Sequence, residues 1–141
     1  MSTERRLRIG GKFEEFVPLE LVERREGELI IAVTFDDRHL NAAGIVHGGF
    51  ITSALDVTLA GAAAAQPGQE ERLFGITLSM TVNFIAPLAP GRVQGRGYVT
   101  GGGRTTKFVD ARLVSAGAPD DPDPVLYATA TGTIRVIELE D

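Results

Sequence analysis

The apolar run from Phe50 to Ala65, which contains a single charged residue, Asp56, most constrains how this chain folds. It is rich in alanine and leucine, lacks proline and ends before Gln66-Pro67-Gly68, which predicts a helix that stops there. Because this helix is apolar on nearly all sides, we expect protein to surround it. An ionised carboxylate is costly to bury unless it is paired or hydrogen-bonded, so Asp56 is a candidate functional residue.

The segments around this helix read mostly as strands. Alternating or β-rich patterns predict strands at 29–35, 74–84, 91–100, 109–113 and 126–136, with a hairpin turn at Gly101 to Gly103 and a polar turn at 119–124. Residues 13–22 allow either a short helix or a strand that leads into a hairpin about Gly27. One early helix followed by strands and short turns predicts an α+β fold, a meandering antiparallel sheet around a buried helix.

Composition narrows the class of protein. A chain of 141 residues predicts one domain, and its net charge of −5 argues against nucleic acid as the main partner. It has no cysteine, which excludes disulfides, thiolate metal sites and a cysteine nucleophile. The N-terminus lacks an apolar signal segment, and the longest apolar run is shorter than the roughly 20 residues of a membrane span. We therefore expect a soluble cytoplasmic protein with no membrane segment.

The glycines Gly48 and Gly49 lie where the helix begins, directly after His47. Uncovered amides at the positive end of a helix form a plausible oxyanion site. Asp56 follows seven residues after Gly49, about two turns or 10 Å away, so the two ends cannot easily serve one reacting atom. If both take part, the spacing predicts a two-fold dimer whose sites combine residues of both chains.

A carboxylate and an oxyanion site, without cysteine, an obvious Ser–His pair or a metal cluster, suit thioester hydrolysis. A thiolate leaves readily, so a carboxylate that activates water or attacks directly is sufficient. His39, His47 and Asp56 match no standard zinc spacing, so no metal site is expected.

The pattern Asn41, Gly44-Ile45-Val46-His47-Gly48-Gly49 and Asp56 resembles the signature of hotdog-fold acyl-CoA thioesterases of the phenylacetate-degradation (PaaI-like) subfamily. The resemblance extends over about residues 16–137 and includes 75–87 and the turn at Gly103-Arg104-Thr105. It implies a single domain spanning 1–141, in which an antiparallel sheet of five to six strands wraps one central helix. It also implies a homodimer, usually paired again into a dimer of dimers, with CoA as part of the substrate and no separate cofactor.

The resemblance also assigns roles to residues. Asp56 would be the general base or nucleophile, and Thr77 would help to hold the attacking water. The amide of Gly48 or Gly49 would polarise the thioester carbonyl with help from Asn41, and His47 would position the thioester. One subunit would supply Asn41, His47 and the glycine amides, and the other Asp56 and Thr77. Gly103, Arg104 and Thr105 would contact the CoA portion of the substrate.

Several alternatives stay open at this level. Asp56 alone also fits a structural carboxylate satisfied by neighbouring hydroxyls, and Arg104 also fits a solvated turn. The period of two places Thr77 on the face opposite Ile76 and Leu78, hence away from the helix if that apolar face packs on it. A bulge or a location at an interface would reconcile this with a role at the site. Two other functions remain: a hotdog enoyl-thioester hydratase or dehydratase, and a non-catalytic acyl-CoA-binding module. The acyl group itself is not specified by the sequence.

Overall fold

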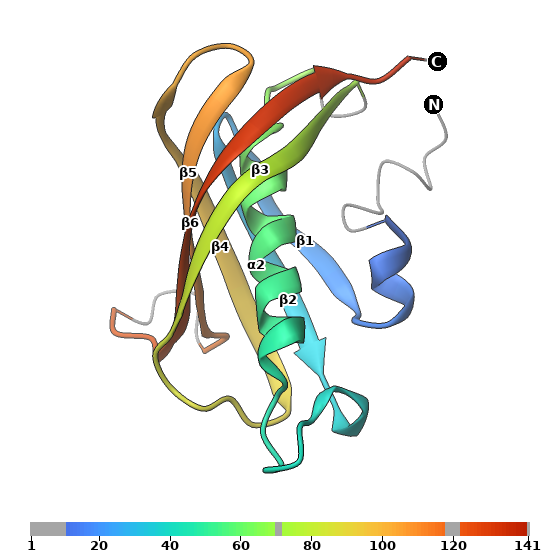
Figure 1. Ribbon diagram of the computed structural model, residues 1–141, viewed down its shortest axis with the longest axis vertical. Coiled ribbons are helices and arrows are strands. Elements are labelled where there is room, and N and C mark those ends of the chain that lie inside the picture. The colour runs from blue at the N-terminus through green and yellow to red at the C-terminus, as the bar shows by residue number, and fades with distance from the viewer. Residues whose placement is uncertain (1–10, 70–71, 118–121, 141) are drawn as a thin grey trace.

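One long helix, α2 (Gly48–Ala63), forms the centre of the molecule, and a single sheet curls around it (Figure 1). The computed structural model describes residues 11–69, 72–117 and 122–140. The strands are β1 (Leu19–Arg25), β2 (Glu28–Phe35), β3 (Leu73–Phe84), β4 (Gly91–Gly102), β5 (Thr106–Ser115) and β6 (Leu126–Glu138). Two short 3₁₀ turns, η1 (Gly11–Glu15) and η2 (Asp37–His39), complete the described elements.

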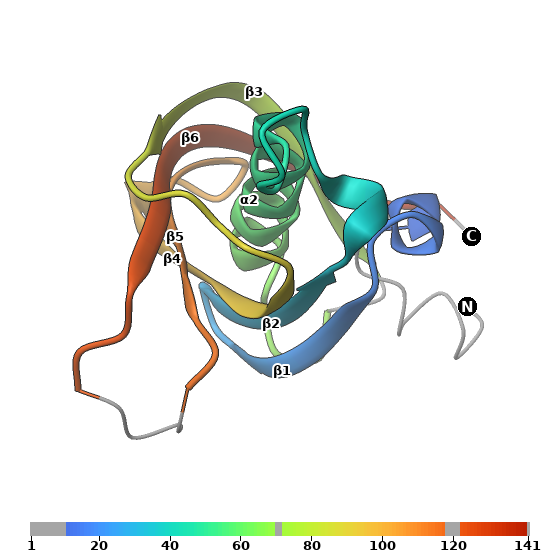
Figure 2. The same cartoon turned by 90° about the horizontal axis from the view of Figure 1, so that it is seen from below.

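The sheet has six strands in the order β1-β2-β4-β5-β6-β3, and every neighbouring pair is antiparallel. The α+β class and the strand number are therefore confirmed. The expected meander is wrong for β3, which does not lie beside β4 but crosses to the far edge and pairs with β6. This crossing lets the sheet enclose α2, as the view along the helix shows (Figure 2).

The helix begins at Gly48, where the sequence placed its beginning, and ends two residues before the end of the apolar run at Ala65. His47 is its N-cap residue, so Gly48 and Gly49 belong to the first turn, and Ala64 is its C-cap. Its buried positions include Ala54, Leu55 and Leu59, which the sheet covers. A stripe at helical spacing stays at least partly exposed: Gly49, Ser53, Asp56 and Ala60. Thr52, Val57 and Gly61 beside this stripe are also partly exposed, so the prediction that protein surrounds the helix holds within the chain except on this face.

Close contact between helix and sheet depends on glycines in the strands. A Cβ at Gly75 of β3 would lie 2.5 Å from the carbonyl oxygen of Ala60, and one at Gly97 of β4 would lie 2.8 Å from that of Thr58. Neither distance is compatible with a real side chain. Glycine at these two positions therefore sets how near the strands approach α2.

A β-bulge interrupts β3. Its pairing with β6 passes from Thr77↔Ile134 directly to Ser79↔Thr133 and skips Leu78. Up to the bulge, Phe74, Ile76 and Leu78 are exposed, whereas after it Met80 and Val82 pack against the core. One continuous apolar face of 74–84 therefore does not pack on the helix, and the alternative of a bulge is the one that the structure has. An extra residue reverses the facing of a strand, because side chains alternate with a period of two.

The N-terminal segment contains both alternatives that the sequence allowed, since η1 precedes β1 and a hairpin at Gly27 leads into β2. Gly27 has a φ of 67°, which a non-glycine residue rarely adopts. The expected turn at 119–124 lies partly outside the described residues. Within the described part of the chain, no helix is long and apolar enough to cross a membrane.

Candidate active site

In the first turn of α2, the N–H of one glycine donates a hydrogen bond, and the N–H of the other has no acceptor among the described residues. His47 caps the helix, and its Nδ1 accepts the N–H of Gly49 at 2.9 Å. A neutral imidazole that accepts at Nδ1 carries its proton on Nε2. Among the described residues the N–H of Gly48 has no acceptor. Of the two amides considered from the sequence, Gly48 is therefore the one available to a ligand oxygen.

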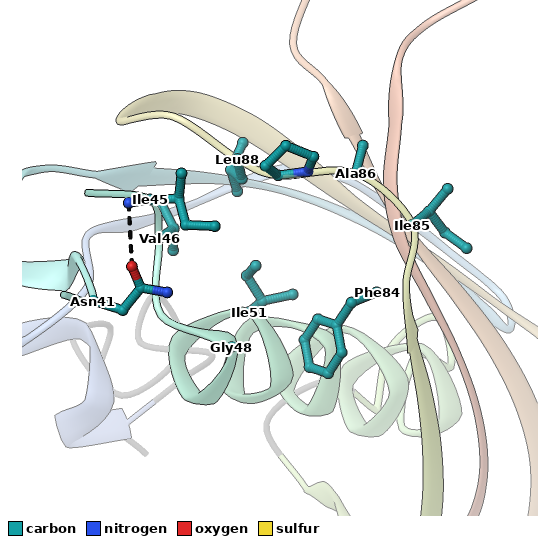
Figure 3. A pocket seen from close by; sticks show the side chains of 10 residues that line it. Asn41, Ile45, Val46, Gly48, Ile51, Phe84, Ile85, Ala86 and Leu88 are labelled. Atoms are coloured by element: carbon teal, nitrogen blue, oxygen red, sulfur yellow. Dashed lines mark hydrogen bonds between the residues drawn. The ribbon is translucent and has the colours of Figure 1, made fainter. Parts of the chain in front are cut away.

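Asn41 lies on the loop that enters the helix, and this loop holds its side chain in one orientation. Its Oδ1 accepts the backbone N–H groups of Ala43 and Ile45 at 2.9 and 3.3 Å. The backbone N–H of Asn41 donates to the Ile45 carbonyl at 2.8 Å. With Oδ1 occupied by two donors, Nδ2 is left as a donor that has no acceptor within the described parts of the chain. Figure 3 shows this nitrogen turned toward the interior of the neighbouring pocket. The structure therefore places two N–H donors, Asn41 Nδ2 and Gly48 N, on one pocket.

His39, for which the sequence suggested no role, fixes the base of this loop. Its side chain is 1% exposed, and its Nδ1 accepts the Asp36 N–H at 2.8 Å. Its Nε2 therefore carries the proton and donates it to the Phe16 carbonyl oxygen at 2.6 Å. Its carbonyl accepts the N–H of His47 at 2.8 Å. Both ring nitrogens are thus engaged, which leaves no lone pair for a metal. The signal in the sequence is Asp36 three residues before His39, a capping-box spacing.

Asp56 and Thr77 meet in the same chain. The Thr77 hydroxyl donates to Oδ1 of Asp56 at 2.5 Å, and both residues are half-buried. The bulge at Leu78 makes this contact possible, because it lets Thr77 share the helix-facing side of β3 with Gly75. The conflict in strand facing is thereby resolved. Asp56 stays partly accessible on the partly exposed stripe of α2.

One chain does not bring the carboxylate to the free amide. Asp56 lies eight residues after Gly48 on the same straight helix, which corresponds to about 12 Å along its axis. The hairpin between β4 and β5, which carries Gly103, Arg104 and Thr105, lies at the opposite end of the sheet from the start of α2 (Figure 1). Arg104 is exposed there. The Gly103 N–H donates to the Thr106 carbonyl and closes the turn, and the Val136 N–H of β6 donates to the Thr105 carbonyl and joins the turn to that strand.

An apolar pocket of about 390 Å³ opens beside Gly48 (Figure 3). Its walls come from Asn41, Ile45 and Val46 of the entry loop, from Ile51 of α2, and from residues 84–88, which form the end of β3 and the first part of its connection to β4. None of the side chains that line it is charged. Among those side chains only Asn41 offers a polar group, so the pocket combines an apolar interior with two N–H donors.

The family is decided by a match to the model of the thioesterase superfamily, which covers residues 43–119. This chain belongs to the thioesterase superfamily. Its six-stranded antiparallel sheet around a single long helix is the hotdog fold of that superfamily. The matched segment of this thioesterase-superfamily member contains the start of α2, Asp56, Thr77 and the hairpin with Arg104.

Individual proteins resemble this superfamily member over most of their length. A protein of Saccharolobus solfataricus named "Putative esterase SSO2140" is 25% identical over 126 residues, 89% of this chain and 84% of that protein. A conserved protein of Pseudomonas aeruginosa has a structure with a TM-score of 0.78 and 26% identity, over 97% of this chain and 100% of that one. The structure of a mutant of the phenylacetic acid degradation protein PaaI from Thermus thermophilus has a TM-score of 0.71 and 27% sequence identity, over 87% of this chain and 96% of that chain.

Proposed function

We propose that this protein is an acyl-CoA thioesterase of the PaaI-like subfamily, which hydrolyses the thioester of an acyl- or arylacyl-CoA. The observation that supports this most strongly is the free amide of Gly48 at an apolar pocket, next to the free Nδ2 of Asn41. Two N–H donors on one side of a substrate carbonyl stabilise the negative charge that develops on its oxygen. CoA enters as part of the substrate, and the proposal needs no metal or separate cofactor.

The reaction joins residues of two chains. Gly48 N–H and Asn41 Nδ2 of one chain polarise the thioester carbonyl, and Asp56 of the other chain attacks it or activates the water that does. Water supplies the new C–O bond as the C–S bond breaks, so the products are a carboxylate and the thiol of CoA. Thr77 holds the Asp56 carboxylate and the attacking water. His47 accepts the Gly49 N–H, which leaves the Gly48 N–H at the start of the helix to the substrate.

The edge strand β3 supports a dimer as part of the proposal. β3 lies at an edge of the sheet, so the backbone groups on its open side have no strand partner among the described residues, and it carries exposed Phe74, Ile76 and Leu78. Long apolar edge strands invite pairing with another strand. The partly exposed stripe of α2 with Asp56 borders the same edge, since Thr77 of β3 bonds to Asp56. We propose that two copies join here, and that dimers pair again into a dimer of dimers.

The CoA portion is assigned to the hairpin. Because the turn at Gly103 to Thr105 lies at the far end of the sheet from its own pocket, we propose that it serves the nucleotide of a substrate bound at a different chain's Gly48. Arg104 is exposed and positively charged, which suits phosphate groups.

A thiol-release assay against a panel of acyl-CoAs tests the proposal. We expect thiol release by the native protein and a fall in kcat of at least about 100-fold in Asp56→Asn and Asp56→Ala, the usual contribution of an acid–base group. Asp37→Asn, which alters an exposed carboxylate outside the site, is the matched control and should retain activity. Full activity in Asp56→Ala would refute the mechanism, and hydration of crotonyl-CoA without thiol release would favour a hydratase.

A further inference from the structure

The sheet has a second face, turned away from α2, and Figure 2 shows no described helix on it at β4, β5 and β6. On these strands the side chains of the core alternate with side chains that point the opposite way, because strand residues alternate with a period of two. We call this second side the outer face. The outer-face residues used below are Arg96 and Tyr98 on β4, Asp110 and Arg112 on β5, and Thr129 and Thr131 on β6.

Strand pairing aligns the charged and aromatic members of the outer face in two rows. Arg96 of β4 lies directly opposite Arg112 of β5, which gives a row with two positive charges. Two residues away along the strands, which is about 7 Å, Tyr98 lies opposite Asp110. A basic row thus lies beside a row that consists of an aromatic ring and a carboxylate.

These side chains lack charged partners in their own chain. Like charges directly opposite each other destabilise a sheet, and Arg96 and Arg112 are such a pair. Within the described parts of the chain, neither Arg112 nor Asp110 forms an ion pair, and the Arg96 guanidinium donates to the neutral Gln94 Oε1 at 3.0 and 3.2 Å. The Tyr98 ring is 43% exposed. The outer face therefore offers two arginines, a carboxylate and a ring to a partner.

A second copy of the same face supplies the missing partners. Two sheets packed face to face can be related by a two-fold axis that runs between them, across the strands and level with Ala111, midway between the two rows. This axis places the basic row of one copy over the other row of the second copy. Arg112 then faces the Asp110 carboxylate of the second copy, and Arg96 faces the Tyr98 ring of the second copy. Both contacts are attractive, and symmetry makes each of them twice.

Other occupants match the outer face less well. A two-fold axis parallel to β5 would place Asp110 over Asp110 and Arg112 over Arg112 of the second copy, and both contacts would repel. A nucleic acid would meet the Asp110 carboxylate beside the arginines, on a chain with a net charge of −5. The neighbouring outer-face residues Thr129 and Thr131 are uncharged and β-branched, which suits the contact between two packed sheets.

We propose that the outer face of β4, β5 and β6 is the surface at which two dimers join, with their sheets in contact and every α2 turned away from it. This rests on the dimer of dimers proposed above and goes beyond it by naming the surface and the residues that pair across it. The β3 edge stays with the first dimer, because β3 and β4 lie on different sides of β5 and β6 in the sheet.

Charge exchange tests the proposal, with native mass spectrometry and light scattering at micromolar concentration as the measurements. The native protein should be a tetramer. Asp110→Arg and Arg112→Asp should each leave dimers, because like charges then face each other and raise the dissociation constant between dimers by at least about 100-fold. The double variant Asp110→Arg/Arg112→Asp exchanges both charges and should recover the tetramer. Asp37→Arg, a change at an exposed carboxylate of η2 away from the outer face, is the control and should stay tetrameric.

Recovery in the double variant cannot be imitated by a folding defect, since it carries both changes. A native protein smaller than a tetramer, a tetramer that persists in both single variants, or a double variant that stays dimeric would overturn the proposal. Thiol release from acyl-CoAs by the native protein is measured alongside. Thiol release together with any of these three results means that the surface is wrong and the thioesterase function stands. Recovery of the tetramer without thiol release means that the surface is right and the thioesterase function fails.

Discussion

The hydroxyl of Thr77 donates a 2.5 Å hydrogen bond to Oδ1 of Asp56, joining the edge strand β3 to the single carboxylate of α2. The bond leaves the second carboxylate oxygen for another partner and fixes the orientation of Asp56 toward the partly exposed stripe. A bulge at Leu78 is what brings Thr77 to this position. The relationship makes Thr77 a determinant of how Asp56 is presented.

Replacement of Thr77 by valine should reduce kcat by about 10- to 100-fold with little change in KM, because hydrogen bonds to charged groups contribute roughly 1.5–3 kcal/mol. Thr77→Ser keeps the hydroxyl and should keep most of the activity. Steady-state kinetics on one acyl-CoA compares the two variants. Equal activity of the valine and serine variants would show that the hydroxyl has no role.

Gly75→Ala should reduce the free energy of unfolding by about 1–3 kcal/mol, since the new Cβ would lie 2.5 Å from the Ala60 carbonyl oxygen and force β3 away from α2. Urea denaturation measures the change. Gly101→Ala, where the nearest atom would be an ordinary 3.8 Å away, is the matched control. An unchanged stability in Gly75→Ala would contradict the tight contact between strand and helix.

His39→Ala should reduce the free energy of unfolding by about 2–4 kcal/mol, because it empties a buried site and leaves the Phe16 carbonyl and the Asp36 amide without their partner. Since the His39 backbone also holds His47, amide hydrogen exchange should become faster at Asn41 and His47. Native-like exchange rates at these amides in the variant would show that the loop does not depend on the ring.

Asp36 should titrate with a pKa of about 2, below its usual 3.8, chiefly because the Arg38 side chain donates hydrogen bonds to it and also because the Arg38 N–H does. A lowered pKa in the folded state means that the ionised form stabilises the fold above pH 3.8, and that this contribution is lost as the pH falls toward about 2. NMR titration of the Asp36 carboxyl measures it, and Arg38→Gln should return the pKa toward 3.8. A native midpoint at or above 3.8 would contradict the pairing.

Local patterns in the sequence predicted the helix and the strands well, because a continuous apolar run and a period of two reflect burial directly. They placed the beginning of the helix at Gly48 and Gly49 but did not predict that His47 caps it through its side chain. They offered a bulge in β3 only as one way to turn Thr77 toward the helix, and they missed the edge position of this strand. Both depend on pairing with β6, a strand distant in the sequence, which no local period encodes.

For the candidate site, the sequence placed Gly48 and Gly49 at the beginning of the helix, directly after His47, and Asp56 about two turns further along it, as the structure has them. It left open which glycine amide is free, because that depends on the ring orientation of His47. The walls of the pocket at 84–88 were not foreseen either. That segment reaches the helix start only through the bonds of Val46 to Leu88 and of Ile85 to Tyr127.

Subunit complementation tests most directly whether each site combines Asp56 of one chain with Gly48 and Asn41 of the other. Asp56→Asn and Asn41→Ala chains, each weakly active alone, are mixed in equal amounts and allowed to exchange. Random pairing makes half of the dimers mixed, and each mixed dimer has one site of its two with both native residues, so activity should recover to about one quarter of native. Activity that stays at the average of the two parent variants, with mixed dimers present by native mass spectrometry, would contradict the shared site.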